Sequence, residues 1–125
     1  MGKMIVCKIF TFEAAHNLPN YDGPCCNQHG HSYKLEVSVS GPIQDVGSEK
    51  GMIVDFSKLK AYIQKNIIDV YDHTNLNESF DDNPTAEKLL YKIVDTIGAM
   101  NGLITKLERV RLWETATSYA EWTAY

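Results

Sequence analysis

The chain has 125 residues, of which 44% are hydrophobic and 22% charged, and its formal net charge is −4. This length and composition predict one globular domain, residues 1–125, with a core of its own. Lysine and arginine are scattered rather than gathered into a basic stripe, no apolar run reaches about 20 residues, and the N-terminus shows no signal pattern, so we expect a cytoplasmic protein that binds neither nucleic acid nor membranes.

The first predicted element is a strand over residues 3–15. Apolar side chains occupy both parities of this strand: Met4, Val6, Phe10, Phe12 and Ala14 on one, and Ile5, Cys7 and Ile9 on the other. Such a strand is predicted to be covered on both sides, with Cys7 as a small core residue. His16 follows in phase with Phe12 and Ala14, so its imidazole should emerge on their face.

A polar loop over residues 17–28 separates this strand from a second one, predicted over residues 29–40. Tyr33, Leu35, Val37 and Val39 alternate there with polar residues. His29 and His31 are in phase with this apolar face, because strand side chains repeat with a period of two. Imidazoles that point into an apolar side need a partner, and a metal ion is the commonest partner that accepts several of them.

Two helices are predicted next. Asp55 is a good N-cap for a helix over residues 56–71, in which apolar side chains recur at helical spacing. Asn83 and Pro84 predict the second start, with a cap residue followed by proline in the first helical position, and Gly98 or Gly102 closes that helix. Residues 103–114 and 119–125 are predicted as two further strands.

The element order β-β-α-α-β-β predicts an α+β fold: a four-stranded, mostly antiparallel sheet with two helices on one face. The helices leave the other face of the sheet uncovered, although the first strand is apolar on that side too. We therefore expect other copies of the chain to cover it.

Six segments, in this order and at this spacing, resemble the 6-pyruvoyltetrahydropterin synthase and 6-carboxytetrahydropterin synthase family. They are FEAAH (12–16), CCNQHGH (25–31), DF (55–56), DHTNLN (72–77), PTAE (84–87) and WET (113–115). The resemblance covers nearly the whole chain and implies a tunnelling fold. In that fold three subunits close a twelve-stranded barrel, and two trimers stack into a homohexamer with active sites at subunit interfaces.

The resemblance also implies which residues hold the metal and which residue starts the chemistry. It marks His16, His29 and His31 as zinc ligands. It marks Cys25, four residues before His29, as the catalytic base. Cys26 leaves two alternatives open: it could take the place of Cys25 as the base, or complete a closed structural CysHis₃ zinc site with the three histidines.

Further residues receive roles only through this resemblance. Asp72 and His73 match the dyad that activates the thiol. Glu114 matches the carboxylate that anchors the pterin and, in some accounts of the family, takes part in a proton relay. Glu87 and Thr85 match positions that contact the pterin. A glutamate in the first turn of a helix is also favoured by the helix dipole alone, so Glu87 has a structural alternative.

The activity that the resemblance implies is that of a zinc-dependent lyase acting on 7,8-dihydroneopterin triphosphate. The short chain favours the 6-carboxytetrahydropterin product, formed with loss of triphosphate and acetaldehyde on the route to queuosine. One alternative is elimination of triphosphate alone to give the 6-pyruvoyl product. Two others are a non-catalytic pterin-binding homologue and an interaction module with a structural zinc. No glycine-rich phosphate loop marks a triphosphate site.

Overall fold

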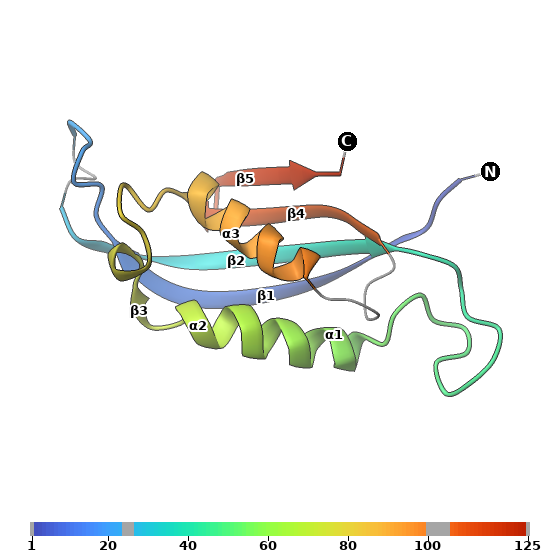
Figure 1. Ribbon diagram of the computed structural model, residues 1–125. Helices are drawn as coiled ribbons and strands as arrows, with labels where there is room; N and C mark the ends of the chain where they lie inside the picture. Colours follow the sequence, from blue (N-terminus) through green and yellow to red (C-terminus); the bar gives the residue numbers. More distant parts are fainter. Residues whose placement is uncertain (1, 24–26, 100–105, 125) are drawn as a thin grey trace.

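The computed structural model describes residues 2–23, 27–99 and 106–124. Four long strands form antiparallel neighbours in one sheet: Ile5–His16 (β1), His29–Ser40 (β2), Lys106–Thr115 (β4) and Ser118–Thr123 (β5). A two-residue strand, Thr74–Asn75 (β3), lies parallel to β1, so the sheet order is β3-β1-β2-β4-β5 (Figure 1). The predicted α+β class is confirmed, and the predicted four-stranded sheet gains one short strand at its edge.

The first predicted helix is confirmed as one continuous helical run. It begins as α1 (Phe56–Ile63), and the Asp55 carboxylate caps it by accepting a 2.8 Å hydrogen bond from the Ser57 backbone nitrogen. It widens into a π-helical segment, Gln64–Ile68 (η2), and ends as α2 (Asp69–Tyr71). A 3₁₀ turn, Leu76–Ser79 (η3), follows β3. No helix among the described residues has the length and apolar character needed to cross a bilayer.

The second helix, Ala86–Gly98 (α3), begins two residues later than predicted. Thr85 is its N-cap, and the Thr85 hydroxyl accepts from the Lys88 backbone nitrogen at 3.3 Å. The Asn83 side chain, which the sequence favoured as the cap, instead accepts from the Asn20 backbone nitrogen at 3.0 Å. Asn83 therefore ties two loops together, and the proline lies before the helix.

The hydrophobic core lies between one face of the sheet and both helices. Cross-strand pairs such as Phe12 with Tyr33 and Leu35 with Leu112 place the apolar residues of β1, β2 and β4 on that face. The buried helical residues of the same cluster are Leu59, Ile63, Ile67, Ile68, Tyr71, Leu89, Leu90, Ile93, Val94 and Ile97. The predicted arrangement of two helices on one face is thus confirmed.

The opposite face of the sheet is open in a single chain. Ile9 is 53% exposed there, and Cys7, predicted as a core residue, is exposed as well. Ile5 is 46% exposed on the same face, and a charged, aromatic group lies further along it on β2 and β4. The Trp113 indole nitrogen donates to the Glu36 carboxylate, and the Lys34 ammonium lies 4.5 Å from the centre of the Trp113 ring. The expected cover on this side therefore does not come from the described part of the chain.

Candidate metal centre and adjoining pocket

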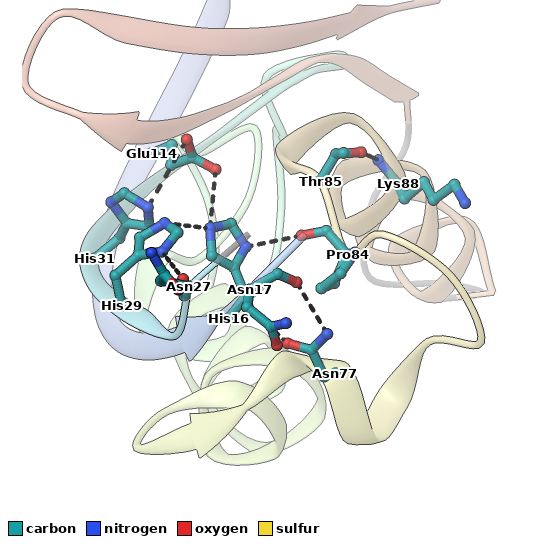
Figure 2. Close-up of polar contacts among 10 residues, drawn as sticks. All are labelled: His16, Asn17, Asn27, His29, His31, Asn77, Pro84, Thr85, Lys88 and Glu114. Carbon is teal, nitrogen blue, oxygen red and sulfur yellow. Dashed lines mark hydrogen bonds and ion pairs between the residues drawn. The ribbon is translucent and has the colours of Figure 1, made fainter. Parts of the chain in front are cut away.

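Three histidine side chains meet at one end of the sheet, on the face that carries the core. His16 is the last residue of β1 and pairs with His29, the first residue of β2, while His31 pairs with Ala14. One potential ligand nitrogen from each imidazole lies within 4.8 Å of the other two (Figure 2). The predicted phase of the three histidines is confirmed, because the strand register turns all of them to the same side.

The hydrogen bonds of two of these rings settle which nitrogen is free. The His16 Nδ1 lies 2.9 Å from the Pro84 carbonyl oxygen, and the His29 Nδ1 lies 2.7 Å from the Asn27 carbonyl oxygen. A carbonyl oxygen can only accept, so each Nδ1 carries the proton of a neutral ring and each Nε2 presents a lone pair. The two Nε2 atoms are 3.1 Å apart. Two lone pairs at this distance repel unless a cation lies beside both.

The third ring adds an unpaired nitrogen to the same place. The His31 Nε2 is buried and has no hydrogen-bond partner among the described residues. Burial lowers the pKa of His31, and this effect outweighs the nearby Glu114 carboxylate, which raises it. A neutral imidazole is the form that binds metals. The donor set of His16, His29 and His31 therefore fits a metal ion such as zinc.

Glu114 lies beside the three histidines, near the end of β4. Its two carboxylate oxygens are each 3.9 Å from an imidazole Nε2, one from that of His16 and the other from that of His31. These distances are too long for hydrogen bonds, so the carboxylate adds negative charge next to the nitrogens without occupying them. It is also open to solvent on one side, because it lines a pocket of about 260 Å³.

This pocket lies between Glu114, which adjoins the histidine cluster, and the start of α3. Glu87 lines it together with Glu114, and the remaining lining residues are Ala86, Ser118, Tyr119 and Ala120. The structure thus brings together two of the predicted substrate contacts. Thr85 precedes this lining, and its hydroxyl is engaged in capping α3. A carboxylate pair in a pocket can accept hydrogen bonds from a ligand that presents several N–H groups.

Asp72 and His73, which were predicted as a dyad, lie in contact with each other at the β1 edge of the sheet. The His73 Nδ1 lies 3.0 Å from the Asp72 Oδ1, which also accepts from the Glu13 backbone nitrogen at 2.8 Å. The Glu13 N–H and then His73 hold the pKa of the Asp72 carboxyl below its usual value of 3.8. His73 adopts a left-handed backbone with φ of 60°, uncommon for a residue other than glycine, and its side chain is 79% exposed.

The dyad does not contact the histidine cluster directly within one chain. Among the described residues, no hydrogen bond or ion pair joins Asp72 or His73 to His16, His29 or His31. His73 and His31 nevertheless line one hollow of about 450 Å³, together with Glu13, Ala14 and Gly30, so the dyad and one of the candidate ligands face the same space. Cys25 and Cys26 lie outside the described residues, so the roles predicted for them stay predictions.

Known proteins resemble this chain in both sequence and fold. A family model described as 6-pyruvoyl tetrahydropterin synthase matches residues 5–124. The chain is 36% identical to a 6-carboxy-5,6,7,8-tetrahydropterin synthase of Haemophilus influenzae, over 94% of this chain and 96% of the relative. It is also 36% identical to a dihydroneopterin monophosphate aldolase of Pyrococcus furiosus, over 83% of each chain. In fold it is similar to a 6-pyruvoyl tetrahydropterin synthase of Caenorhabditis elegans, with a TM-score of 0.83 at 24% identity, covering 100% of this chain and 98% of that one.

Proposed function

Because the chain belongs to the 6-pyruvoyl tetrahydropterin synthase family, we propose that it is a zinc-dependent lyase. It converts 7,8-dihydroneopterin triphosphate to 6-carboxy-5,6,7,8-tetrahydropterin with loss of triphosphate and acetaldehyde, on the route to queuosine. The observation that carries this proposal is the convergence of three imidazole nitrogens beside a pocket that holds two carboxylates. The name of the Haemophilus influenzae relative supports the 6-carboxy product.

His16, His29 and His31 are the proposed zinc ligands. Three imidazoles leave coordination positions open, which is typical of a catalytic rather than a structural zinc site. Zinc in such a site supplies a Lewis acid that polarises oxygen atoms of a substrate. The protein's own contribution is to hold the rings. The Pro84 and Asn27 carbonyls fix the tautomers of His16 and His29, so that both rings present Nε2.

Glu114 and Glu87 are proposed to bind the pterin. The aminopyrimidine edge of a pterin presents a ring N–H and an amino group, and a carboxylate accepts from both at once. Such a pair discriminates between ligands, because a bound ring without these donors shields the carboxylate from water and leaves it unpaired. Thr85 is proposed to serve the same pocket, since its cap fixes the start of the helix that carries Glu87.

The proton-transfer step is assigned to Cys25, Asp72 and His73. A thiolate is the reactive form of cysteine, and a neighbouring imidazolium or metal lowers the pKa of a thiol from about 8.5 toward neutrality. Asp72 orients His73, and its negative charge would stabilise the protonated ring. His73 is exposed at an edge of the sheet, which supports an active site at a subunit interface. The assembly that we propose is a homohexamer, a dimer of trimers.

A second candidate function uses the same site. The family model that matches residues 5–124 is described by the 6-pyruvoyl reaction, in which triphosphate alone is eliminated. The aldolase relative indicates that the family also includes carbon–carbon bond cleavage of a dihydroneopterin. The reactions differ in their products, so the product identifies the enzyme.

The test is incubation of zinc-loaded protein with 7,8-dihydroneopterin triphosphate and separation of the products by mass. We expect a 6-carboxypterin together with acetaldehyde. A 6-pyruvoyl product without acetaldehyde would establish the second candidate. Retention of the intact substrate by protein that holds zinc and binds pterin would identify a non-catalytic pterin-binding protein.

Two matched variants separate the roles of the adjacent cysteines. We expect Cys25→Ala to lose turnover and keep zinc, and Cys26→Ala to keep both. Turnover lost only in Cys26→Ala, with zinc retained, would move the base to Cys26. Zinc and fold lost together in Cys26→Ala would indicate the closed structural site.

A further inference from the structure

On the outer edge of the sheet, the backbone just after β1 is held by a side chain and not by a neighbouring strand. On its outer edge β1 pairs with β3 only at Ala14 and Ala15. β3 ends at Asn75, whose side chain caps η3 by accepting from the Asn77 backbone nitrogen at 3.0 Å. The chain thus turns away from the sheet just as β1 reaches His16. The backbone that follows His16 needs another partner to be fixed.

The Asn77 carboxamide is that partner. Its Oδ1 accepts from the Asn17 backbone nitrogen at 2.9 Å, and its Nδ2 donates to the Asn17 carbonyl oxygen at 2.9 Å. The two bonds also settle the orientation of the amide, because the backbone N–H must meet an acceptor and the carbonyl a donor. The side chain therefore supplies both groups that a neighbouring strand would supply. An aspartate of the same size would place a second acceptor against the Asn17 carbonyl.

These contacts lie one peptide away from the first of the candidate ligands. The His16 side chain is 2% exposed, and the Pro84 carbonyl holds its Nδ1. Figure 2 shows Asn77 on Asn17, with His16 between that contact and the other histidines. Besides its pairing with His29 in the sheet, His16 is thus fixed at two further points, its ring by Pro84 and the adjoining backbone by Asn77. Of these two contacts, only the one from Asn77 comes from a side chain.

We propose that Asn77 is a positioning residue of the metal centre, a role that rests on the proposed function of His16, His29 and His31 as ligands. By closing both backbone hydrogen bonds of Asn17, it sets the position from which His16 presents its Nε2. Metal–ligand distances are held to about 0.2 Å, so a small shift of the backbone at His16 weakens binding by all three rings. Asn77 touches neither the metal position nor the substrate pocket, and it acts only through His16.

The test compares Asn77→Asp with Asn20→Ala. Asn20 lies in the same pair of loops, and its side chain donates to Asp82 at 2.6 Å without contacting the neighbours of His16. Zinc affinity is measured by competition with a chromophoric chelator, below the melting temperature of each variant. We expect Asn77→Asp to bind zinc about 10- to 100-fold more weakly, as is typical when a group that supports a ligand is lost. The absorption spectrum of bound Co²⁺ should change as well. Asn20→Ala should match the unmodified protein in both measurements.

A purely structural role for Asn77 predicts a different result. The melting temperature of Asn77→Asp would fall, while the zinc affinity and the Co²⁺ spectrum of the folded protein stayed unchanged, and that result would overturn the proposal. Nitrogen NMR of the histidine rings in metal-free protein gives a second readout. The proposal requires the His16 signals to change in Asn77→Asp and not in Asn20→Ala. If the unmodified protein binds no metal, the proposed function fails, and unchanged His16 signals would then still exclude Asn77 as a positioning residue.

Discussion

His16 and His31 show how differently two rings of one cluster are supported. The His16 Nδ1 donates to the Pro84 carbonyl, so one of the two polar nitrogens of this ring has a hydrogen-bond partner within the protein. The His31 Nε2 is buried without a hydrogen-bond partner among the described residues. A buried polar atom without a partner costs stability, and a hydrogen-bonded one contributes a little. Without metal, the unpaired His31 Nε2 therefore destabilises the fold, whereas the bond from the His16 Nδ1 to Pro84 stabilises it.

Two substitutions to leucine should consequently change the stability of the metal-free protein in opposite directions. His31→Leu removes the unpaired nitrogen, and we expect the free energy of unfolding to rise by about 1 kcal/mol. His16→Leu removes the bond to Pro84 and leaves its carbonyl oxygen unpaired, and we expect this loss to exceed the relief of the repulsion with the His29 Nε2, so the same quantity should fall by about 1–2 kcal/mol. Urea unfolding in the presence of a chelator measures both. A decrease of similar size in the two variants would contradict this account of His31.

The position of these histidines could be predicted from the sequence, and the role of Asn77 could not. Strand phase alone places His16, His29 and His31 on the apolar face, because a period of two determines the direction of a side chain wherever the strand is correctly placed. The contact between Asn77 and Asn17 joins residues 60 positions apart. No local pattern carries that information, and asparagines in loops are common for other reasons.

Glu108 joins three segments of the chain at a place far from the histidines. It lies at a bulge where the register between β2 and β4 shifts, opposite Ser38 and Val39. Its buried carboxylate accepts from the Lys3 ammonium at 2.8 Å and from the Ser40 hydroxyl at 2.5 Å. A bulge leaves one residue without a partner in the ladder, and here the side chain of that residue ties the N-terminal segment to β2.

These donors, the Lys3 ammonium first, hold the pKa of Glu108 below its ordinary value of 4.5. A depressed carboxyl pKa contributes stability that is fully present above the unfolded pKa and is lost as the pH falls through the folded one. We therefore expect Glu108→Gln to lower the melting temperature at pH 7, and this difference to shrink progressively below pH 4.5. Glu78→Gln, at an exposed position, is the control, and its melting temperature should differ little from that of the unmodified protein at any pH. If the difference in melting temperature between Glu108→Gln and the unmodified protein stayed constant from pH 7 to pH 3, that result would argue against the ionic contribution.

The elements that the sequence did not predict are short or locally irregular. β3 has two polar residues and no periodicity, and it forms only because residues 74–75 reach the edge of β1. Ile63 and Ile67 are both buried although η2 is π-helical. The apolar residues therefore have the spacing of an ordinary α-helix, and the sequence does not reveal the π-helical segment. Asn83 and Thr85 are both good caps, and only the contact of Asn83 with Asn20 decides between them.

At the scale of the whole molecule, the sheet has one buried face and one open face. The open face carries apolar side chains on β1 and a charged, aromatic group around Trp113 on β2 and β4. β3 with β1 forms one edge of the sheet and β5 forms the other (Figure 1). Exposed strand edges and an open face favour association with further copies of the chain.

A charge on the open face should therefore disrupt assembly, and the same charge on a helix should not. We expect Ile9→Glu to shift the protein from a hexamer toward monomers in sedimentation velocity. Ala61→Glu places the same side chain at an exposed position of α1 and should keep the assembly of the unmodified protein. An unmodified protein that sediments as a monomer would exclude the proposed hexamer outright.

The pairing of β1 with β2 makes metal binding depend on the correct alignment of the two strands. The residues that build the core and the three histidines follow one another along the same faces of the two strands, so a single alignment serves both. A chain whose β1 slipped by one residue would turn Phe12 and His16 together to the open side. Such a misfolded chain could not gather three imidazoles. Retention on an immobilised metal resin, eluted under native conditions, would therefore separate correctly aligned molecules from slipped ones.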